Sequence, residues 1–178
     1  YQLYSQGILY EKTRNQQNLL MKQEAADHCR KAIAAFPKSH GALQCSSLLE
    51  NILAQSVRVK METYIPVQAR ARILVEYANL DSVRFTVMRI PAGFGNEFSP
   101  LKDSLKLVTI ATLKTEAEWN VKLKNPGDYQ IHATEVVLPP LSPGRYMIVA
   151  KINDPTRKTF EQTFAFAFIQ VTDLVLLH

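Results

Sequence analysis

The histidines and acidic residues are the first places to look for chemistry in this sequence. Four histidines occur at positions that match no spacing of metal ligands, namely His28, His40, His132 and His178. The one local cluster is Asp128, His132 and Glu135. On a strand, His132 and Glu135 would point to opposite faces, so they could not share a site. We interpret this cluster as exposed strand residues and expect no metal site.

The sequence also lacks the short motifs of common catalytic centres. It contains no Gly-rich phosphate loop, no nucleophile elbow and no pair of catalytic carboxylates. We therefore predict no enzyme, no catalytic residue and no cofactor within these residues. An unrecognised hydrolase is the alternative, and the lack of any catalytic constellation disfavours it.

The two cysteines, Cys29 and Cys45, lie eight residues on either side of Pro37. Both fall on apolar faces of predicted helices, which would place them at similar height on facing helices. A disulfide would require the two Cα atoms to come within about 7 Å. Small neighbours would have to permit this approach, namely Ala25, Ala26 and Ala42. Because helix axes usually lie about 8–10 Å apart, we favour buried free thiols over a disulfide.

The elements that position these residues differ between the two parts of the chain. In residues 1–55 the apolar side chains recur with helical spacing, for example from Leu19 to Phe36. Pro37 cannot continue a helix, and Ser39 can cap a second helix that runs to Leu53. The spacing near Tyr1 indicates an earlier helix. We predict a helical segment over 1–55, built around an antiparallel helical hairpin.

From residue 56 onward the apolar residues alternate, as they do in strands. Seven such runs are separated by turn residues, at 57–61, 71–77, 83–87, 119–123, 131–133, 146–152 and 164–168. Short strands at this spacing predict a seven-stranded antiparallel β-sandwich of the immunoglobulin-like type over 56–178. The apolar residues between 100 and 115 fit a strand or a helix equally well.

Two features of the β region are predicted to be structural. Pro143 and Gly144 suit the central positions of a type II turn, in which Gly supplies a positive φ. Tyr146 then begins a new strand, so these three residues form a structural corner between two strands. Trp119 opens an alternating strand whose other face is charged. We expect Trp119 to be a core anchor buried between the sheets.

The net charge of +5 raises the question of nucleic-acid binding. The densest basic group, however, alternates with apolar residues: Arg58, Lys60, Arg70 and Arg72. We interpret these four residues as the solvent faces of two strands rather than a phosphate-binding patch. No apolar run approaches the length of a membrane span. We expect no nucleic-acid partner and no membrane contact within this sequence.

Three stretches carry a resemblance to a known family. The stretch WNVKLKNPGDYQIHATEVVLPPLSPGRYMIVAKI, residues 119–152, resembles the N-terminal region of bacterial alpha-2-macroglobulin-like proteins of the Bacteroides type. FAFAFIQVTDLVLL, residues 164–177, resembles a closing strand that leads into the next macroglobulin-like domain. CRKAIAAFPKSHGALQCSSLLENIL, residues 29–53, resembles a helical, tetratricopeptide-like segment that precedes such domains.

This resemblance implies a macroglobulin-like β-sandwich within a large extracytoplasmic protein, in the periplasm or at the cell surface and anchored to the membrane. Its partners would be adjacent macroglobulin-like domains of the same chain, which residues 175–177 would contact, and proteases trapped by the full-length protein. The thioester signature of the family is absent, since Cys45 is followed by Ser46, Ser47 and Leu48. No long bait-like segment occurs either, so the resemblance implies a non-catalytic scaffold domain.

A cell-surface module that binds a peptide or a glycan is the second functional class. It would require an exposed aromatic platform, for which the candidates are Tyr64, Phe94, Phe98 and Trp119. These aromatic residues show no pattern, and burial in the core is the simpler interpretation of each one.

Overall fold

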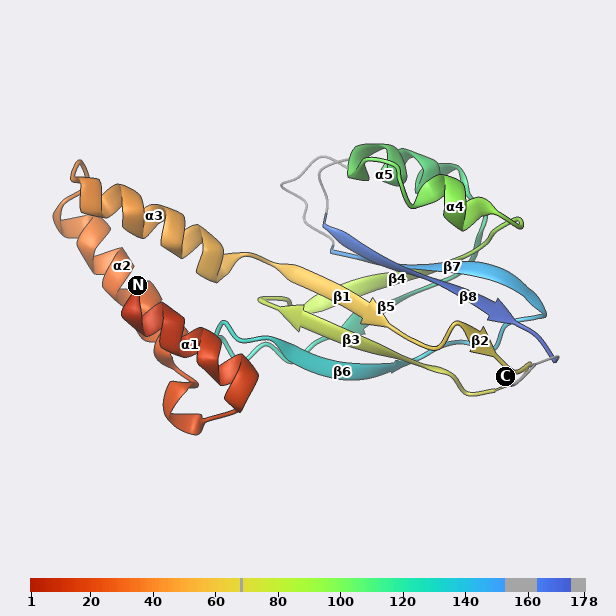
Figure 1. The fold of residues 1–178 in the computed structure, drawn as a ribbon, viewed down its shortest axis with the longest axis horizontal. Helices are drawn as coiled ribbons and strands as arrows, with labels where there is room; N and C mark the ends of the chain where they lie inside the picture. Colours follow the sequence, from red (N-terminus) through yellow and green to blue (C-terminus); the bar gives the residue numbers. More distant parts are fainter. Residues whose placement is uncertain (68, 153–162, 174–178) are drawn as a thin grey trace. The chain divides into compact units, whose positions relative to one another are not determined.

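The computed structural model describes residues 1–67, 69–152 and 163–173 (Figure 1). The chain forms two compact units. The first unit contains Tyr1–Ser56 together with Tyr77–Asp81 and Lys124–His132, and the second contains the rest of the chain. Helices come first in the sequence and two β-sheets follow. Within the described ranges, no helix has the length and apolar character required to cross a membrane.

The first unit is built on three α-helices and one short 3₁₀ helix. They are α1 (Gln2–Thr13), η1 (Gln16–Asn18), α2 (Met21–Ala35) and α3 (His40–Leu53). As predicted, Ser39 caps α3, because its side chain accepts a hydrogen bond from Ala42 N at 3.1 Å. The core contains Ala25, Ala26, Cys29, Leu48 and Ile52. A tetratricopeptide-like hairpin is not confirmed by this arrangement.

Two loops between strands complete the first unit. Asn79, with a φ of 57°, donates from Nδ2 to the carbonyl oxygens of Ile52 at 2.8 Å and Ala54 at 2.9 Å. Gln130 Nε2 donates to Leu19 O at 2.9 Å. Backbone groups at helix ends have no hydrogen-bond partner within the helix, and the side chains of Asn79 and Gln130 provide such partners. The second loop also contributes the ring of Tyr129, which packs against the helical core.

In the described residues, eight strands form two sheets. One sheet has the order β1-β3-β6, from Ser56–Lys60, Arg72–Ala78 and His132–Val137. The other has the order β2-β8-β7-β4-β5, from Tyr64–Ile65, Phe164–Val171, Gly144–Lys151, Ser82–Arg89 and Thr115–Lys122. All seven predicted runs overlap strands. The short β2 is an additional strand and pairs parallel to β8, so seven strictly antiparallel strands are not confirmed.

Alternate side chains of both sheets form the β core. Ile73 and Val75 on β3 are fully buried, and so are Phe85 on β4 and Ile148 on β7. The residues between them on β3 and β4 are more exposed. Side chains of successive strand residues point to opposite faces, so this pattern gives each sheet an inner apolar face, as in a β-sandwich.

The segment that fitted strand or helix equally well is helical. α4 (Phe94–Phe98) and α5 (Asp103–Thr112) lie over the β7–β8 side of the five-stranded sheet (Figure 1). Buried Phe98 packs with Met147 and Val149 of β7, and Ile110 of α5 joins this cluster. The helices therefore cover a sheet face that would otherwise expose a second apolar surface.

Two structural predictions need correction. Trp119 is only half-buried, because β5 is an edge strand of the five-stranded sheet; its ring stacks on Phe85, with the ring centroids 5.3 Å apart. Phe85, the cross-strand partner of Trp119, is the buried ring of the pair. Gly144 has an extended backbone with a φ of 159° and is the first residue of β7, so it is not the left-handed centre of a type II turn.

Some predicted features lie outside the described residues. These are the apolar segment at 175–177 and His178.

Candidate functional site

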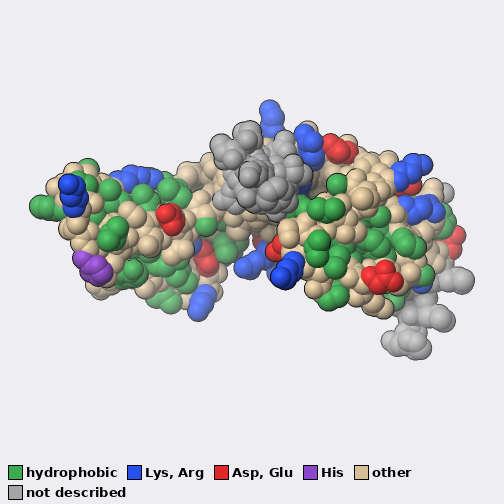
Figure 2. All heavy atoms as spheres, turned by 90° about the horizontal axis from the view of Figure 1, so that it is seen from above, with side chains coloured by type: hydrophobic (Ala, Val, Ile, Leu, Met, Phe, Trp, Pro, Cys, Tyr) green, Lys and Arg blue, Asp and Glu red, His purple; other side chains and the backbone are tan. Residues whose placement is uncertain are grey.

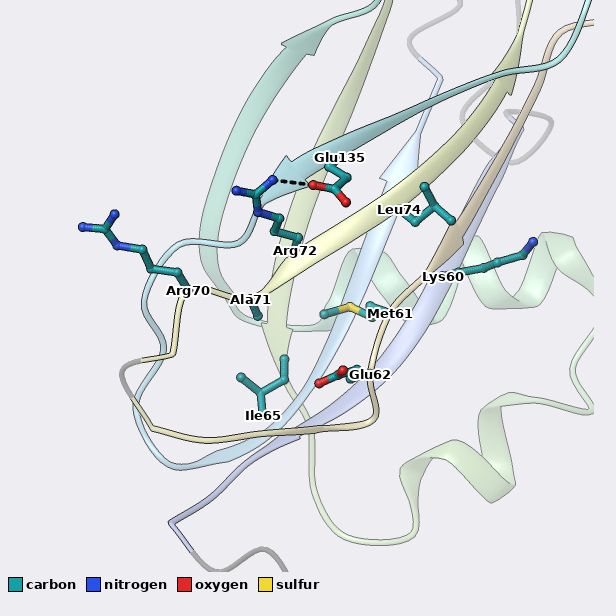
Figure 3. A pocket seen from close by; sticks show the side chains of 9 residues that line it. All are labelled: Lys60, Met61, Glu62, Ile65, Arg70, Ala71, Arg72, Leu74 and Glu135. Atoms are coloured by element: carbon teal, nitrogen blue, oxygen red, sulfur yellow. Dashed lines mark hydrogen bonds and ion pairs between the residues drawn. The ribbon is translucent and has the colours of Figure 1, made fainter.

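A recess of about 530 Å³ lies beside the three-stranded sheet (Figure 3). The end of β1 and the residues after it supply Lys60, Met61 and Glu62. Its apolar lining comes from Met61, Ile65, Ala71 and Leu74, and its charged lining from Lys60, Glu62, Arg70, Arg72 and Glu135. A recess with both kinds of lining can contact a ligand or a peptide that has apolar and charged groups.

Most charges of this recess are already paired. Arg72 forms an ion pair with Glu135, and Lys60 Nζ lies 2.8 Å from Glu76 Oε1. Arg70 makes no hydrogen bond or ion pair with the described residues, and it points away from the other lining side chains, opposite to Lys60 (Figure 3). Because the cations do not converge, the recess does not form a phosphate-binding cluster. Arg70 alone could meet a carboxylate.

The basic residues singled out in the sequence are exposed, as predicted: Arg58, Lys60, Arg70 and Arg72. On the molecular face that Figure 2 draws, Lys and Arg side chains are scattered and do not form a continuous stripe. A dispersed distribution of this kind does not follow a nucleic-acid backbone.

A smaller groove of about 180 Å³ lies at the β2 edge of the five-stranded sheet. Tyr64 of β2, Phe94 of α4, Phe168 of β8 and Arg145 of β7 line this groove. A side chain at Gly95 would place its Cβ 3.3 Å from the Phe168 ring, so glycine lets α4 lie close to β8. The groove combines aromatic rings with a guanidinium group.

The structure separates the four aromatic residues proposed as a platform. Tyr64 is 57% exposed and shares the groove with the half-buried Phe94. Phe98, the last residue of α4, is buried, and Trp119 lies on β5 at the opposite edge of the sheet. Two of the four therefore meet at one surface, and sequence spacing gave no signal for this pairing because the two residues lie on different elements.

The cluster of Asp128, His132 and Glu135 does not assemble. His132 Nε2 and Asp128 Oδ1 are 2.9 Å apart, whereas Glu135 pairs with Arg72. The prediction of exposed strand residues is wrong for Asp128, which is buried and precedes β6. Within residues 1–67, 69–152 and 163–173, no group of three His, Cys, Asp or Glu side chains could hold a metal ion.

The corner before β7 is held by one hydroxyl group. Tyr146 is buried, and its hydroxyl donates to Ser142 O at 2.8 Å and accepts from Arg89 Nη2 at 2.8 Å. Arg89 also lies over the Tyr146 ring, with Cζ 5.2 Å from the centroid, and donates to Pro143 O at 3.3 Å. A Cβ at Gly144 would lie 3.2 Å from Arg89 Cζ. Glycine therefore leaves room for this guanidinium group. A tyrosine bonded to the backbone a few residues upstream is a feature of immunoglobulin-like sandwiches.

Cys29 and Cys45 are free thiols. Cys29 is buried on α2, and Cys45 is half-buried on α3. Burial, reinforced by the neighbouring Cys45 thiol, raises the pKa of Cys29 to about 11. Both side chains line a cavity of about 500 Å³ within the first unit.

No family model matches this sequence, and no curated protein matches it significantly. Among solved structures, the CARDB domain of a Pyrococcus furiosus protein matches 67% of this chain. It was solved as a crystal structure in complex with di-metal ions and as a solution structure, and each is 15% identical to this chain. The TM-scores are 0.36 and 0.38, and 88% and 95% of those chains are covered.

A crystal structure of native alpha-2-macroglobulin from Escherichia coli, spanning domains MG0-NIE-MG1, is 16% identical with a TM-score of 0.45. That match covers 67% of this chain and 39% of the Escherichia coli chain. With identities and TM-scores this low, these similarities assign neither a family nor a ligand to this chain. The resemblance to the Bacteroides type therefore remains a prediction.

Proposed function

We propose that this chain is a non-catalytic scaffold region of a larger alpha-2-macroglobulin-like protein that traps proteases at the bacterial cell envelope. Its partners in this proposal are adjacent macroglobulin-like domains of the same chain, and it meets proteases only through the full-length protein. The proposal places the chain outside the cytoplasm, in the periplasm or at the cell surface.

One observation carries this proposal: the buried polar side chains bind the protein's own backbone. The hydroxyl of Tyr146 donates to Ser142 O, and that of Tyr77 donates to Lys124 O at 2.9 Å. Burial raises the pKa of Tyr77, so this hydroxyl keeps its proton. Buried Lys22 donates to Tyr129 O at 3.2 Å, and buried Gln130 donates to Leu19 O at 2.9 Å.

Such hydrogen bonds fix turns and helix ends, because a buried polar side chain without a partner costs about 1–3 kcal/mol. Polar groups used in this way hold the backbone in place and are not directed at a substrate. This distribution supports an architectural role.

The proposal is tested with the isolated chain and with the full-length protein. The isolated chain should neither inhibit a panel of endoproteases nor incorporate methylamine. In the full-length protein, Phe85→Ala in this β core should reduce retention of the attacking protease, measured by size-exclusion chromatography. Arg58→Gln at an exposed position should leave retention unchanged. Stoichiometric inhibition by the isolated chain would overturn the proposal.

A second candidate function is peptide or glycan binding at a cell surface, and the aromatic groove favours it. Tyr64, Phe94 and Arg145 offer ring faces and a guanidinium group on one surface. Arrays of short acidic peptides and of bacterial surface glycans would test this function. Binding that Tyr64→Ala abolishes and Tyr10→Ala preserves would support it, whereas equal binding by both variants would exclude the groove.

A further inference from the structure

The two thiols lie in one apolar seam between α2 and α3. Cys29 belongs to the buried core of the first unit, and Cys45 packs against that core. Cys29 and Cys45 therefore share one cluster of packed apolar side chains. The seam is lined by small residues, since Ala25, Ala26 and Ala42 are all buried there. Small side chains let the backbones of two helices approach, and a disulfide needs such an approach.

A cavity connects this thiol pair with the surface. Its volume of about 500 Å³ is within the range of small-molecule sites, and both cysteines line it together with His28, Gln44 and Leu48. Cys29 is 4% exposed, whereas Cys45 is half-buried. A reagent that enters the cavity therefore reaches Cys45 more readily than Cys29.

We propose that Cys29 and Cys45 are a redox-active dithiol, which a small disulfide such as oxidised glutathione converts into a Cys29–Cys45 disulfide. Cys45 loses its proton to solvent, attacks one sulfur of the oxidant and expels the first thiolate. Cys29 then loses its proton, attacks Cys45 Sγ in the mixed disulfide and expels the second thiolate. The two protein thiols are oxidised by two electrons, and the small disulfide is reduced to two thiols.

The different environments of the two thiols fix the order of these steps. Burial and, secondarily, the neighbouring Cys45 thiol raise the pKa of Cys29, so Cys29 is protonated at neutral pH. The thiolate is the nucleophile, and Cys29 is therefore a poor first attacker. Once Cys45 carries the small thiol, Cys29 is the adjacent group that can displace it.

The test uses the whole chain, reduced and then exposed to a series of oxidised and reduced glutathione ratios. We expect both thiols to disappear together, the mass to fall by about 2 Da and the chain to stay monomeric. Peptide mapping without reductant should recover Cys29 joined to Cys45. Thermal unfolding should occur about 10 °C higher in the oxidised chain, because the disulfide closes a short loop.

Single substitutions test the order of the steps. Cys29→Ala should accumulate a stable glutathione adduct on Cys45, and Cys45→Ala should react with oxidised glutathione at least about tenfold more slowly. The proposal is overturned if the wild-type chain ends with two glutathione adducts, forms disulfide-linked dimers, or keeps both thiols throughout the series. These outcomes are measured on the wild-type chain, so the test holds even if a variant fails to fold.

Discussion

Tyr146 joins three parts of the β7 corner through one hydroxyl group. Tyr146→Phe keeps the buried ring but removes the bonds to Ser142 O and Arg89. We expect the free energy of unfolding to fall by about 1–3 kcal/mol, because Ser142 O and the guanidinium group of Arg89 each lose a hydrogen-bond partner. Urea titration measures the change. Tyr64→Phe, at an exposed ring, is the control and should change stability by less than about 0.5 kcal/mol; equal losses in the two variants would contradict the role of the corner.

Cys29 gives the reduced protein a pH dependence in the alkaline range. Its pKa rises from 9.0 to about 11 because burial disfavours the thiolate. The folded state therefore binds this proton more tightly than the unfolded state. The associated stability is fully present below pH 9 and is lost as the pH rises through about 11, by about 2–3 kcal/mol. The measurement is the free energy of unfolding against pH for the wild type and Cys29→Ala under reducing conditions. Parallel curves would show that burial of Cys29 has no such effect.

At the scale of elements, the end of α3 depends on a loop between strands. Asn79 donates to the carbonyl oxygens of Ile52 and Ala54, and its φ of 57° is left-handed. Asn79→Gly removes the hydrogen bonds but tolerates this φ, so we expect a loss of about 1–2 kcal/mol. Asn79→Ala adds the strain of a left-handed alanine, for a loss of about 2–3 kcal/mol. Thermal unfolding of the two variants measures the difference. If Asn79→Ala is at least as stable as Asn79→Gly, the backbone strain is ruled out.

The pairing of β4 and β5 places two stacked rings in different environments. Phe85 is fully buried, whereas Trp119 is half-buried on the edge strand. We expect Phe85→Ala to cost about 3–5 kcal/mol by leaving a cavity. Trp119→Ala should cost only about 1–2 kcal/mol, because it removes a stacking contact and part of an apolar surface. Denaturant titration compares the two, and a larger loss for Trp119 would reverse this assignment.

The local pattern of apolar residues was sufficient to predict the elements that have one buried face. The alternation along β3 and β4 indicates strands because each of these strands places one face in the core. Residues 103–112 were ambiguous because α5 buries mainly Leu107 against a sheet that the sequence does not identify as its partner. β2 has only two residues and takes its conformation from pairing with β8, so no local period could reveal it.

The candidate sites were harder to predict than the elements. The alternation that defines a strand does not distinguish a central from an edge strand, and the exposure of Trp119 depends on that difference. Likewise, Tyr64 and Phe94 meet because β2 and α4 adjoin β8. This proximity depends on the tertiary structure and cannot be read from local sequence. The proximity of the two cysteines was predicted in part, since their symmetric spacing about Pro37 placed both thiols at similar height on two helices.

At the scale of the whole molecule, contacts within the first unit join segments that are distant in sequence. Cleavage of an inserted protease site between Gln55 and Ser56 should therefore leave residues 1–55 bound to the remainder. Asn79, Gln130 and the ring of Tyr129 would still hold the helices. Size-exclusion chromatography should show one peak without denaturant and two peaks in urea. Asn79→Ala combined with Gln130→Ala should weaken the association, and separate elution of the wild-type pieces without denaturant would contradict the prediction.

The discontinuous first unit has a consequence for inheritance. The chain passes between the units at 56/57, 76/77, 81/82, 123/124 and 132/133. A recombination event with a single breakpoint after residue 56 would transfer the helices without the two loops that bind their ends. Genetic exchange could preserve both units only by moving the region as a whole. Homologues should therefore carry the helices and the β region together, and residues 79, 129 and 130 should vary in step with the helical residues that they contact.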